Sequence, residues 1–230
     1  MRQTVTRAIV IARTNFQEAD RILTVLTPDH GKVRLIAKGV RRVKSKLAGG
    51  IELLSVNDIT FIQGRGEVST LVSARLHHHF GNIVKDIDRT MLAYTFMRWI
   101  NRATEDVAEA DYYLLIERAL TSLDDVKIPL DIIELWFAMQ LLKISGHAPN
   151  LRTDANNAFL LPDERYEFRM EPMAFEQYAR GAFRAREIKV LRLGLRAENP
   201  EVIANVTDVG AVISAVLPLA RSILKQSVRI

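Results

Sequence analysis

The period of the hydrophobic pattern changes near residue 80, and this change constrains the fold more than any other feature of the sequence. Before it, apolar residues alternate with polar ones or gather in short β-branched runs, as they do in strands. After it, apolar residues recur every three or four positions over long segments, as they do in helices. The sequence therefore predicts an α+β, multidomain chain, with a β domain at residues 1–80 and a mainly α-helical domain at residues 81–230.

Five strand-like segments, joined by short connections and one long loop, lie in the first 80 residues. Turn-forming sequences separate several of them, such as Pro-Asp-His-Gly at 28–31 and Gly-Arg-Gly at 64–66. Asn57 and Asp58, inside the fourth segment, predict a bulge or bend. The pattern favours a small antiparallel β-barrel of the OB-fold type, with an SH3-like barrel as the alternative. The predicted strands cover residues 5–12, 22–27, 32–38, 51–63 and 67–76.

The third and fifth predicted strands alternate, so their faces can be assigned. In the third, Leu35 and Ala37 oppose Lys32, Arg34 and Lys38, which gives this strand a basic outer face. In the fifth, uninterrupted alternation places on one face Val68, Thr70, Val72, Ala74 and Leu76.

Helical spacing dominates the remainder of the chain. A short β-hairpin is predicted near residues 158–168, "AFLLPDERYEF", around the turn residues 162–165. Thr207 or Asp208 could cap the last helix. The predicted helices cover residues 83–102, 110–123, 130–145, 172–181, 185–194 and 206–226.

Positive charge is concentrated in the β domain. Residues 1–80 hold 13 Lys or Arg against 6 Asp or Glu, a net charge of +7, whereas the remaining residues hold 19 against 21, a net charge of −2. The stretch "AKGVRRVKSKLAGG" at 37–50 lies in a segment, between Asp29 and Glu52, that contains no acid. A solvated loop is one interpretation, but clustered cations repel each other, and a polyanion such as nucleic acid would relieve that repulsion.

We therefore predict that a nucleic acid contacts eight cationic side chains of the barrel. Arg21 is a weaker candidate, because it could pair instead with Glu18 or Asp20. Phe, Tyr and Trp are scarce in the barrel, limited to Phe16, Phe61 and Phe80. Contacts with backbone phosphates, weak sequence preference and steep salt dependence are the expected consequences. The predicted contacts are Lys32, Arg34, Lys38, Arg41, Arg42, Lys44, Lys46 and Arg65.

Motifs for catalysis or cofactor binding are missing from the sequence. It contains no cysteine, no G-x-S-x-G and no H-E-x-x-H, and Gly64-Arg65-Gly66 is too short for a phosphate-binding loop. His77, His78 and His79 have no nearby acid or cysteine to complete a metal site, so no metal is assigned. A binding protein without cofactor is predicted rather than an enzyme.

Three sequence blocks resemble the RecO family of bacterial DNA repair and recombination mediator proteins. They are "FQEADRILTVLTPDHGKVRLIAKGVRRVKSKLAGGIELL" at 16–54, "LLKISGHAPNL" at 141–151 and "LARSILKQSVRI" at 219–230. The first block is the most specific. One departure follows the second block: many family members carry a CxxC-type zinc element there, whereas this chain reads "RTDANNAFLLP". Zinc is therefore not expected, and the small hairpin must be held by packing.

The resemblance implies an N-terminal OB-fold, a helical domain and a set of partners. RecO proteins bind single- and double-stranded DNA and anneal complementary strands. With RecR they help to load the recombinase onto DNA coated by single-strand-binding protein. The implied partners are therefore DNA, RecR and the C-terminal tail of single-strand-binding protein, and the implied location is cytoplasmic and nucleoid-associated.

The residues alone leave a second function open. The helical domain could bind a partner peptide while the basic loop contacts an acidic tail or RNA, which would make the chain a protein–protein adaptor. No membrane is expected in either case. Arg7 and Arg13 interrupt any signal-peptide core, and no run approaches the roughly 20 apolar residues of a membrane span.

Overall fold

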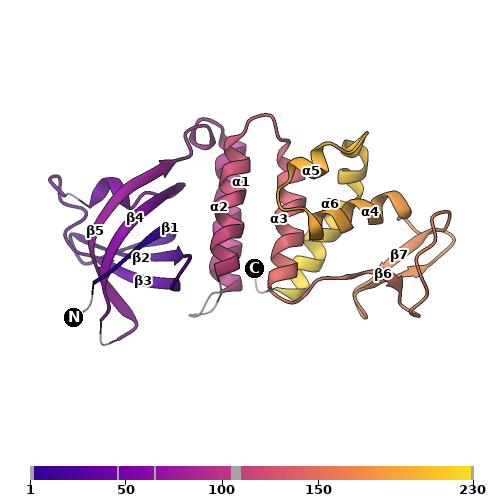
Figure 1. The fold of residues 1–230 in the computed structure, drawn as a ribbon, viewed down its shortest axis with the longest axis horizontal. Coiled ribbons are helices and arrows are strands. Elements are labelled where there is room, and N and C mark those ends of the chain that lie inside the picture. Colours follow the sequence, from indigo (N-terminus) through magenta and orange to yellow (C-terminus); the bar gives the residue numbers. More distant parts are fainter. Residues whose placement is uncertain (1–2, 46, 65, 105–109, 229–230) are drawn as a thin grey trace. The chain divides into compact units, whose positions relative to one another are not determined.

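Two compact units, Met1–Asp125 and Val126–Ile230, make up the chain (Figure 1). The computed structural model describes residues 3–45, 47–64, 66–104 and 110–228. The change from strand to helix falls near residue 80, as predicted, but two helices after it belong to the first unit. The predicted division into domains 1–80 and 81–230 stays a prediction.

Five strands of the first unit form a closed barrel in the order β1-β2-β3-β5-β4. Four of the neighbouring pairs are antiparallel, and β3 pairs with β5 in parallel. This order, with one parallel pair closing the sheet, is that of an OB-fold, so the fold class expected from the sequence is confirmed apart from that one pair. The strands are β1 (Gln3–Phe16), β2 (Asp20–Thr27), β3 (Gly31–Ala37), β4 (Ser55–Ile62) and β5 (Val68–His79).

The parallel pair that closes the barrel is short. It runs from Arg34, opposite Val68, to Ile36, opposite Thr70. The first residues of β3 pair with β2 but extend beyond the start of β5. The boundary between these two strands, called here the β3–β5 seam, is therefore paired at one end and open at the other.

Two irregularities in the β4–β5 ladder change which side chains face the core. One lies at Val56/Asn57, as the sequence predicted. The other lies opposite Thr60 and Phe61, where β5 gains a residue, so Leu71 is buried in the core and Val72 is 43% exposed. The predicted uninterrupted face of β5 is thus wrong, because a bulge reverses the side on which the following residues emerge.

The long loop between β3 and β4 is part of the barrel's structure. Val40 and Ile51 are buried in the barrel core, beside Leu35 and Leu71. The 3-10 turn η1 (Ala48–Gly50) lies so close to β5 that a Cβ at Gly50 would come within 2.5 Å of the carbonyl carbon of Ala74. Glycine at this position lets the loop pass directly over the backbone of the strand.

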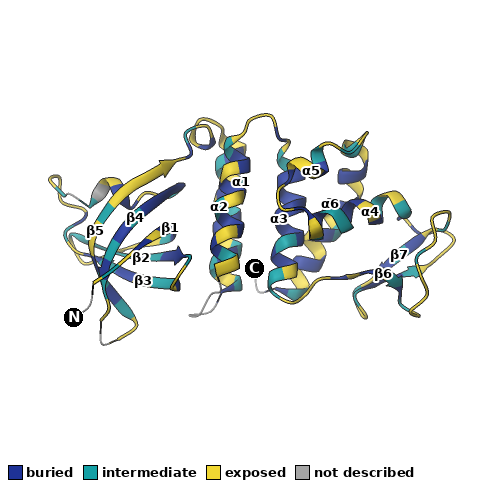
Figure 2. Cartoon of the chain, in the orientation of Figure 1, coloured by how far each residue is buried: buried dark blue, intermediate teal, exposed yellow. Residues whose placement is uncertain are grey.

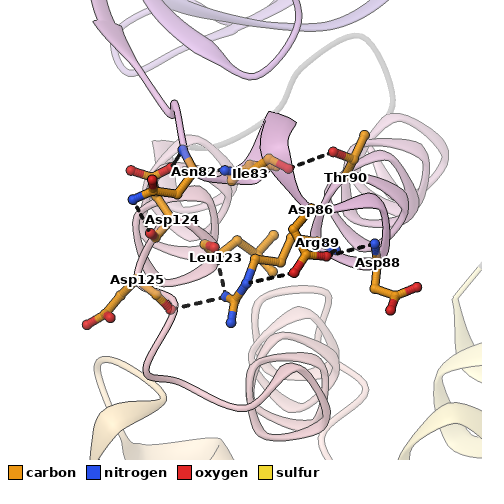
Figure 3. Close-up of polar contacts among 9 residues, drawn as sticks. All are labelled: Asn82, Ile83, Asp86, Asp88, Arg89, Thr90, Leu123, Asp124 and Asp125. Atoms are coloured by element: carbon orange, nitrogen blue, oxygen red, sulfur yellow. Dashed lines mark hydrogen bonds and ion pairs between the residues drawn. The ribbon is translucent and has the colours of Figure 1, made fainter.

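A polar network joins the entry to the first helix with the end of the second (Figure 3). The 3-10 turn η2 (Ile83–Lys85) leads into α1 (Ile87–Ala103), which packs on α2 (Ala110–Asp124). Asp124 Oδ1 accepts hydrogen bonds from the backbone N–H groups of Asn82, at 2.7 Å, and Ile83. The Arg89 guanidinium, buried between the helices, donates to the carbonyl oxygens of Leu123 and Asp125.

The acids in this network have structural roles. Asp86 is the N-cap of α1 and accepts hydrogen bonds from the backbone of Asp88 and Arg89. Asp124, at the C-terminal end of α2, uses its carboxylate to accept the two backbone hydrogen bonds described above. The network fixes both helices of the first unit to each other at the end where that unit stops.

The second unit is built around one almost wholly buried helix, α3 (Leu130–Ile144), which Figure 2 shows in dark blue along most of its length. It packs against α4 (Ala185–Arg196) and α6 (Val209–Ser227). Trp136 donates a hydrogen bond to the carbonyl of Ala197, which precedes the short helix α5 (Glu201–Ala204). Buried Glu134 accepts two hydrogen bonds from Arg221, at 2.5 and 2.6 Å.

α6 has the length and apolar composition of a membrane span. Its apolar residues are buried where it packs against α3 and α4, so it is a core helix of the second unit. The expected side-chain cap is not formed. Asp208 is at the N-cap position, but its backbone is left-handed, with φ of 49°, and its side chain makes no capping bond.

The small sheet of the second unit differs from the predicted hairpin. Its strands are β6 (Asn150–Asp154), β7 (Tyr166–Arg169) and β8 (Ala174–Gln177), in the order β6-β8-β7. The hairpin joins β7 to β8, so the prediction of a hairpin at 158–168 is wrong, as is the prediction of a helix at 172–181. Before β7 begins at Tyr166, the predicted hairpin segment contributes only an isolated bridge, from Phe159 to Thr153.

Aromatic packing holds this sheet. Phe175 is fully buried, and its ring meets those of Phe168, at 5.1 Å between centroids, and Phe183, at 5.4 Å, edge to face. Tyr166 contacts the same ring.

Gly50→Ala is expected to destabilise the first unit by about 1–3 kcal/mol, the usual cost of an overpacked site. The added methyl group would collide with the backbone at Ala74. Gly49→Ala is the matched control, since a Cβ there meets no atom within 4 Å. Urea unfolding of both variants measures the difference, and equal stability would contradict the anchoring of the loop on β5.

Candidate nucleic-acid interface

The outer face of β3 carries two of the predicted cations, and a third follows the strand directly. Leu35 and Ala37 are buried in the barrel core, so the two-residue period of the strand turns Lys32 and Arg34 outward. Lys38 follows directly after the strand and is exposed. Positive charge therefore extends from Lys32, near the start of β3, to Lys38, at the beginning of the long loop.

Lys32 has a structural contact in addition to its place on this face. Its Nζ donates to the carbonyl oxygens of Asn101 and Thr104 at the C-terminal end of α1. These carbonyls carry the negative end of the helix dipole, which favours a cation there. Lys32 therefore fixes α1 to the barrel, and its charge is partly engaged before any ligand arrives.

Arg34 forms an open ion pair with Glu67, on the loop between β4 and β5. Arg34 Nη1 lies 3.6 Å from Glu67 Oε2, and the two side chains are 45% and 83% exposed. Exposed pairs of this length contribute little to stability, so a stronger anion can displace Glu67 from Arg34.

The basic loop, described at residues 38–45, is held against the loop that joins β1 to β2. The backbone N–H of Gly39 donates to Asp20 Oδ1 at 2.7 Å, and that of Arg41 donates to the carbonyl of Ala19 at 2.9 Å. Gly39 has φ of +65°, a left-handed conformation that glycine adopts without strain. Buried Val40 anchors the same turn in the core. The backbone of the loop therefore has a defined path.

Four cations of the basic loop are exposed and form no ion pair with a described acid, although Arg41 Nη1 donates to the carbonyl oxygen of Gln17 at 3.4 Å. Lys38, Arg41, Arg42 and Lys44 are exposed, and no carboxylate of a described residue lies within 4 Å of them. Glu18 and Asp20 line the same surface hollow as Lys38 and Arg42, so the mutual repulsion of the cations is only partly compensated there. A polyanion laid across this end of the barrel would relieve it.

Two predicted contacts, Lys46 and Arg65, lie outside the described residues. Arg21 uses its Nε to donate to Asn15 Oδ1, at 3.1 Å, instead of pairing with Glu18 or Asp20. Asp20 is engaged with Gly39, so the acid beside the basic loop serves to position it.

The three consecutive histidines lie at the exposed end of β5. His77 Nδ1 is 3.3 Å from Asp58 Oδ2, and the ring of His78 meets that of Phe80 edge to face. Nowhere in the described ranges do three His, Cys, Asp or Glu side chains gather as a metal site requires.

Sequence reasoning missed a groove of about 380 Å³ at the open end of the β3–β5 seam. Strand patterns indicate the face of each residue but not how far two strands stay paired, so no signal in the sequence marks the opening. The groove is lined by Thr4, His30, Lys32, Val33, Arg34, Phe61, Gln63, Gly66, Glu67 and Ser69.

These features define a class of protein: an OB-fold with an exposed basic loop that continues onto a basic strand. Residues 1–80 match the family described as "Recombination protein O N terminal". This match confirms the predicted resemblance to the RecO family over the residues that form the barrel.

Relatives with curated names agree with the domain match. The chain is 34% identical over 152 residues to DNA repair protein RecO of Dehalococcoides mccartyi strain CBDB1, which covers 66% of this chain and 59% of that protein. It is 30% identical over 162 residues to DNA repair protein RecO of Rubrobacter xylanophilus, covering 70% and 65%. The match to the Streptomyces coelicolor protein of the same name is 33% over 149 residues, covering 61% and 60%. The chain thus spans about three fifths of the length of these relatives.

Glu67→Gln is expected to raise the affinity for single-stranded DNA about two- to fivefold at low salt, because it releases Arg34 from an exposed ion pair and removes a negative charge from the face. Fluorescence anisotropy of a labelled oligonucleotide measures the effect. The control is Glu176→Gln, which opens the exposed pair with Arg169 in the second unit. Unchanged or weaker binding by Glu67→Gln would contradict a DNA path along β3.

Proposed function

We propose that the chain is a DNA-binding recombination mediator that binds single- and double-stranded DNA through the basic loop and the outer face of β3. The observation that carries the proposal is the set of exposed, unpaired cations on a loop fixed by Asp20 and Val40. The relatives named DNA repair protein RecO support a role in repair and recombination.

The proposed mechanism is electrostatic. Two complementary strands repel each other through their phosphates, and this repulsion opposes annealing. A surface that holds one or both backbones releases their counterions and lowers the barrier without consuming ATP. Because the loop backbone is already positioned, little ordering entropy is lost when DNA binds. No catalytic step or cofactor is required.

RecR and single-strand-binding protein are the proposed partners in recombination. In the proposed sequence of events, the chain holds a strand coated by single-strand-binding protein and, with RecR, helps to load the recombinase. The proposed location is cytoplasmic, at the nucleoid. Among the proposed activities, strand annealing follows most directly from the basic surface, because annealing needs no other part of the chain.

Reversal of three loop charges tests the proposal. Arg41→Glu, Arg42→Glu and Lys44→Glu together are expected to abolish binding of single-stranded DNA at moderate salt and to stop annealing. At low salt, the plot of log K against log salt is expected to become shallower. Its slope should lose about 2 in magnitude, since each of three phosphate contacts with a single strand contributes about 0.7. Circular dichroism and thermal unfolding check that the fold survives.

The matched control places the same charge change on the second unit. Lys143→Glu, Arg180→Glu and Lys225→Glu alter three exposed side chains and reduce the net charge equally. This variant is expected to bind DNA nearly as wild type does. If the loop variant anneals DNA as well as wild type, or if the control loses as much affinity, the loop is not the binding surface.

A groove in the second unit favours a peptide partner in addition to DNA. It has a volume of about 120 Å³ and is lined by Leu160, Leu161, Pro162, Ala185, Ile188, Lys189 and Arg192. Phe159 and Leu161 beside it are 75% and 55% exposed. Apolar walls with a cationic rim suit an acidic peptide with an apolar end, and we propose the tail of single-strand-binding protein as that peptide.

Lys189→Glu is expected to weaken binding of a labelled tail peptide about fivefold or more, because it reverses the charge at the rim of the groove. Arg192 is less suitable for the test, since its Nε is held by the carbonyl of Leu151. Lys143→Glu, an exposed lysine on α3, is the control. A salt titration of DNA binding and peptide binding in parallel separates the two functions: tight peptide binding without DNA binding would favour the adaptor.

A further inference from the structure

The groove at the open end of the β3–β5 seam has the features of a site for a small, flat ligand. Its volume of about 380 Å³ is within the usual range of ligand sites, about 300–1,000 Å³. Its lining is mostly polar, with side chains that donate or accept hydrogen bonds, and includes the apolar side chains of Val33 and Phe61. The proposed contact with DNA phosphates does not account for such a groove, because phosphates are bound well by an open basic surface.

The barrel's own topology creates the opening. β3 and β5 pair only from Arg34 to Ile36, so the first residues of β3 extend past β5. Gly64 lets the β4–β5 loop fold back, since a Cβ there would lie 2.6 Å from the carbonyl oxygen of Val68. The loop therefore forms one wall of the groove, and the start of β3 forms another.

An aromatic pair lies at this groove. The ring of His30 stands at 90° to that of Phe61, with 5.9 Å between their centroids. Phe61 is 5% exposed and fixed in the core, whereas His30 is exposed. The backbone N–H of His30 donates to Thr27 Oγ1 at 3.0 Å, which holds the turn that carries the ring. The imidazole is thus a pre-positioned surface on which a flat ring can stack.

Polar groups that can read the edge of a ring surround this aromatic pair. Gln63 offers an amide, Ser69 a hydroxyl and Glu67 a carboxylate. Arg34 lies at the same groove and can hold a phosphate once Glu67 is displaced. A planar heterocycle linked to a phosphate matches this combination of groups, and an unpaired nucleotide of a single strand is such a ligand.

We propose that the β3–β5 groove binds one unpaired nucleobase of a single strand, stacked on His30, while the phosphates continue along Arg34 and Lys38 toward the basic loop. This inference rests on the proposed DNA binding and deepens it. It adds a contribution from the base to a surface that was expected to grip only the backbone. A paired base cannot enter the groove, so the site favours single strands over duplex.

The test compares an oligothymidylate with an abasic deoxyribose-phosphate polymer of the same length, at one salt concentration. Both carry the same phosphates, so their difference isolates the bases. Stacking of a base on an aromatic side chain contributes about 1–3 kcal/mol, so wild type is expected to bind the oligothymidylate at least about fivefold more tightly. His30→Ala is expected to remove most of that preference, without changing affinity for the abasic polymer.

Two further variants make the result specific. His30→Phe keeps a flat ring and is expected to retain the preference for bases, which separates stacking from the charge or hydrogen bonds of the imidazole. His147→Ala removes an exposed histidine of the second unit and is expected to behave as wild type.

The possible failures are distinguishable. If wild type binds neither polymer at low salt, the proposed DNA binding itself is wrong. If wild type binds both polymers equally, or if His30→Ala weakens both by the same factor, DNA binding stands and the nucleobase site is overturned.

Discussion

The parallel pairing of β3 with β5 is the constraint on which the rest of the first unit depends. It closes the sheet into a barrel, and it requires β4 to be reached by a long excursion from the end of β3. That excursion contains the basic loop. Because the pairing spans only three positions, it also leaves the seam open at its other end, where the groove lies. Loop and groove are thus two consequences of one short ladder, joined by the basic face of β3.

The charges on this barrel are divided between holding the fold and facing solvent. Lys32 holds the end of α1, and Asp20 holds the turn at Gly39. The cations that follow on the basic loop form no ion pair with an acid among the described residues. The buried charged groups Arg89 and Glu134, by contrast, are satisfied inside the units. Un-neutralised charge therefore gathers at one end of the barrel, where a polyanion can use it.

The sequence predicts those parts of the molecule that depend on local pattern, and fails where contacts between distant segments decide. Five strand-like segments and the turn sequences between them predict a small barrel, and the alternation in β3 predicts its basic face. The bulge beside Val72 could not be predicted, since it depends on the partner strand. The hairpin was displaced to Tyr166–Gln177 because Phe175 fills the core there, although proline and charged residues at 162–165 gave the stronger local turn signal. The groove at His30 depends on where β3 and β5 separate, and the sequence of neither strand indicates that position.

The central claim is that a single strand lies along β3 between the groove and the basic loop. Photo-crosslinking of the whole protein to an oligonucleotide that carries 4-thiothymidine, followed by mass spectrometry of the digest, tests it most directly. The account predicts crosslinks in peptides from residues 30–45, with fewer as salt is raised. Crosslinks confined to Val126–Ile230, or spread evenly over both units, would contradict it.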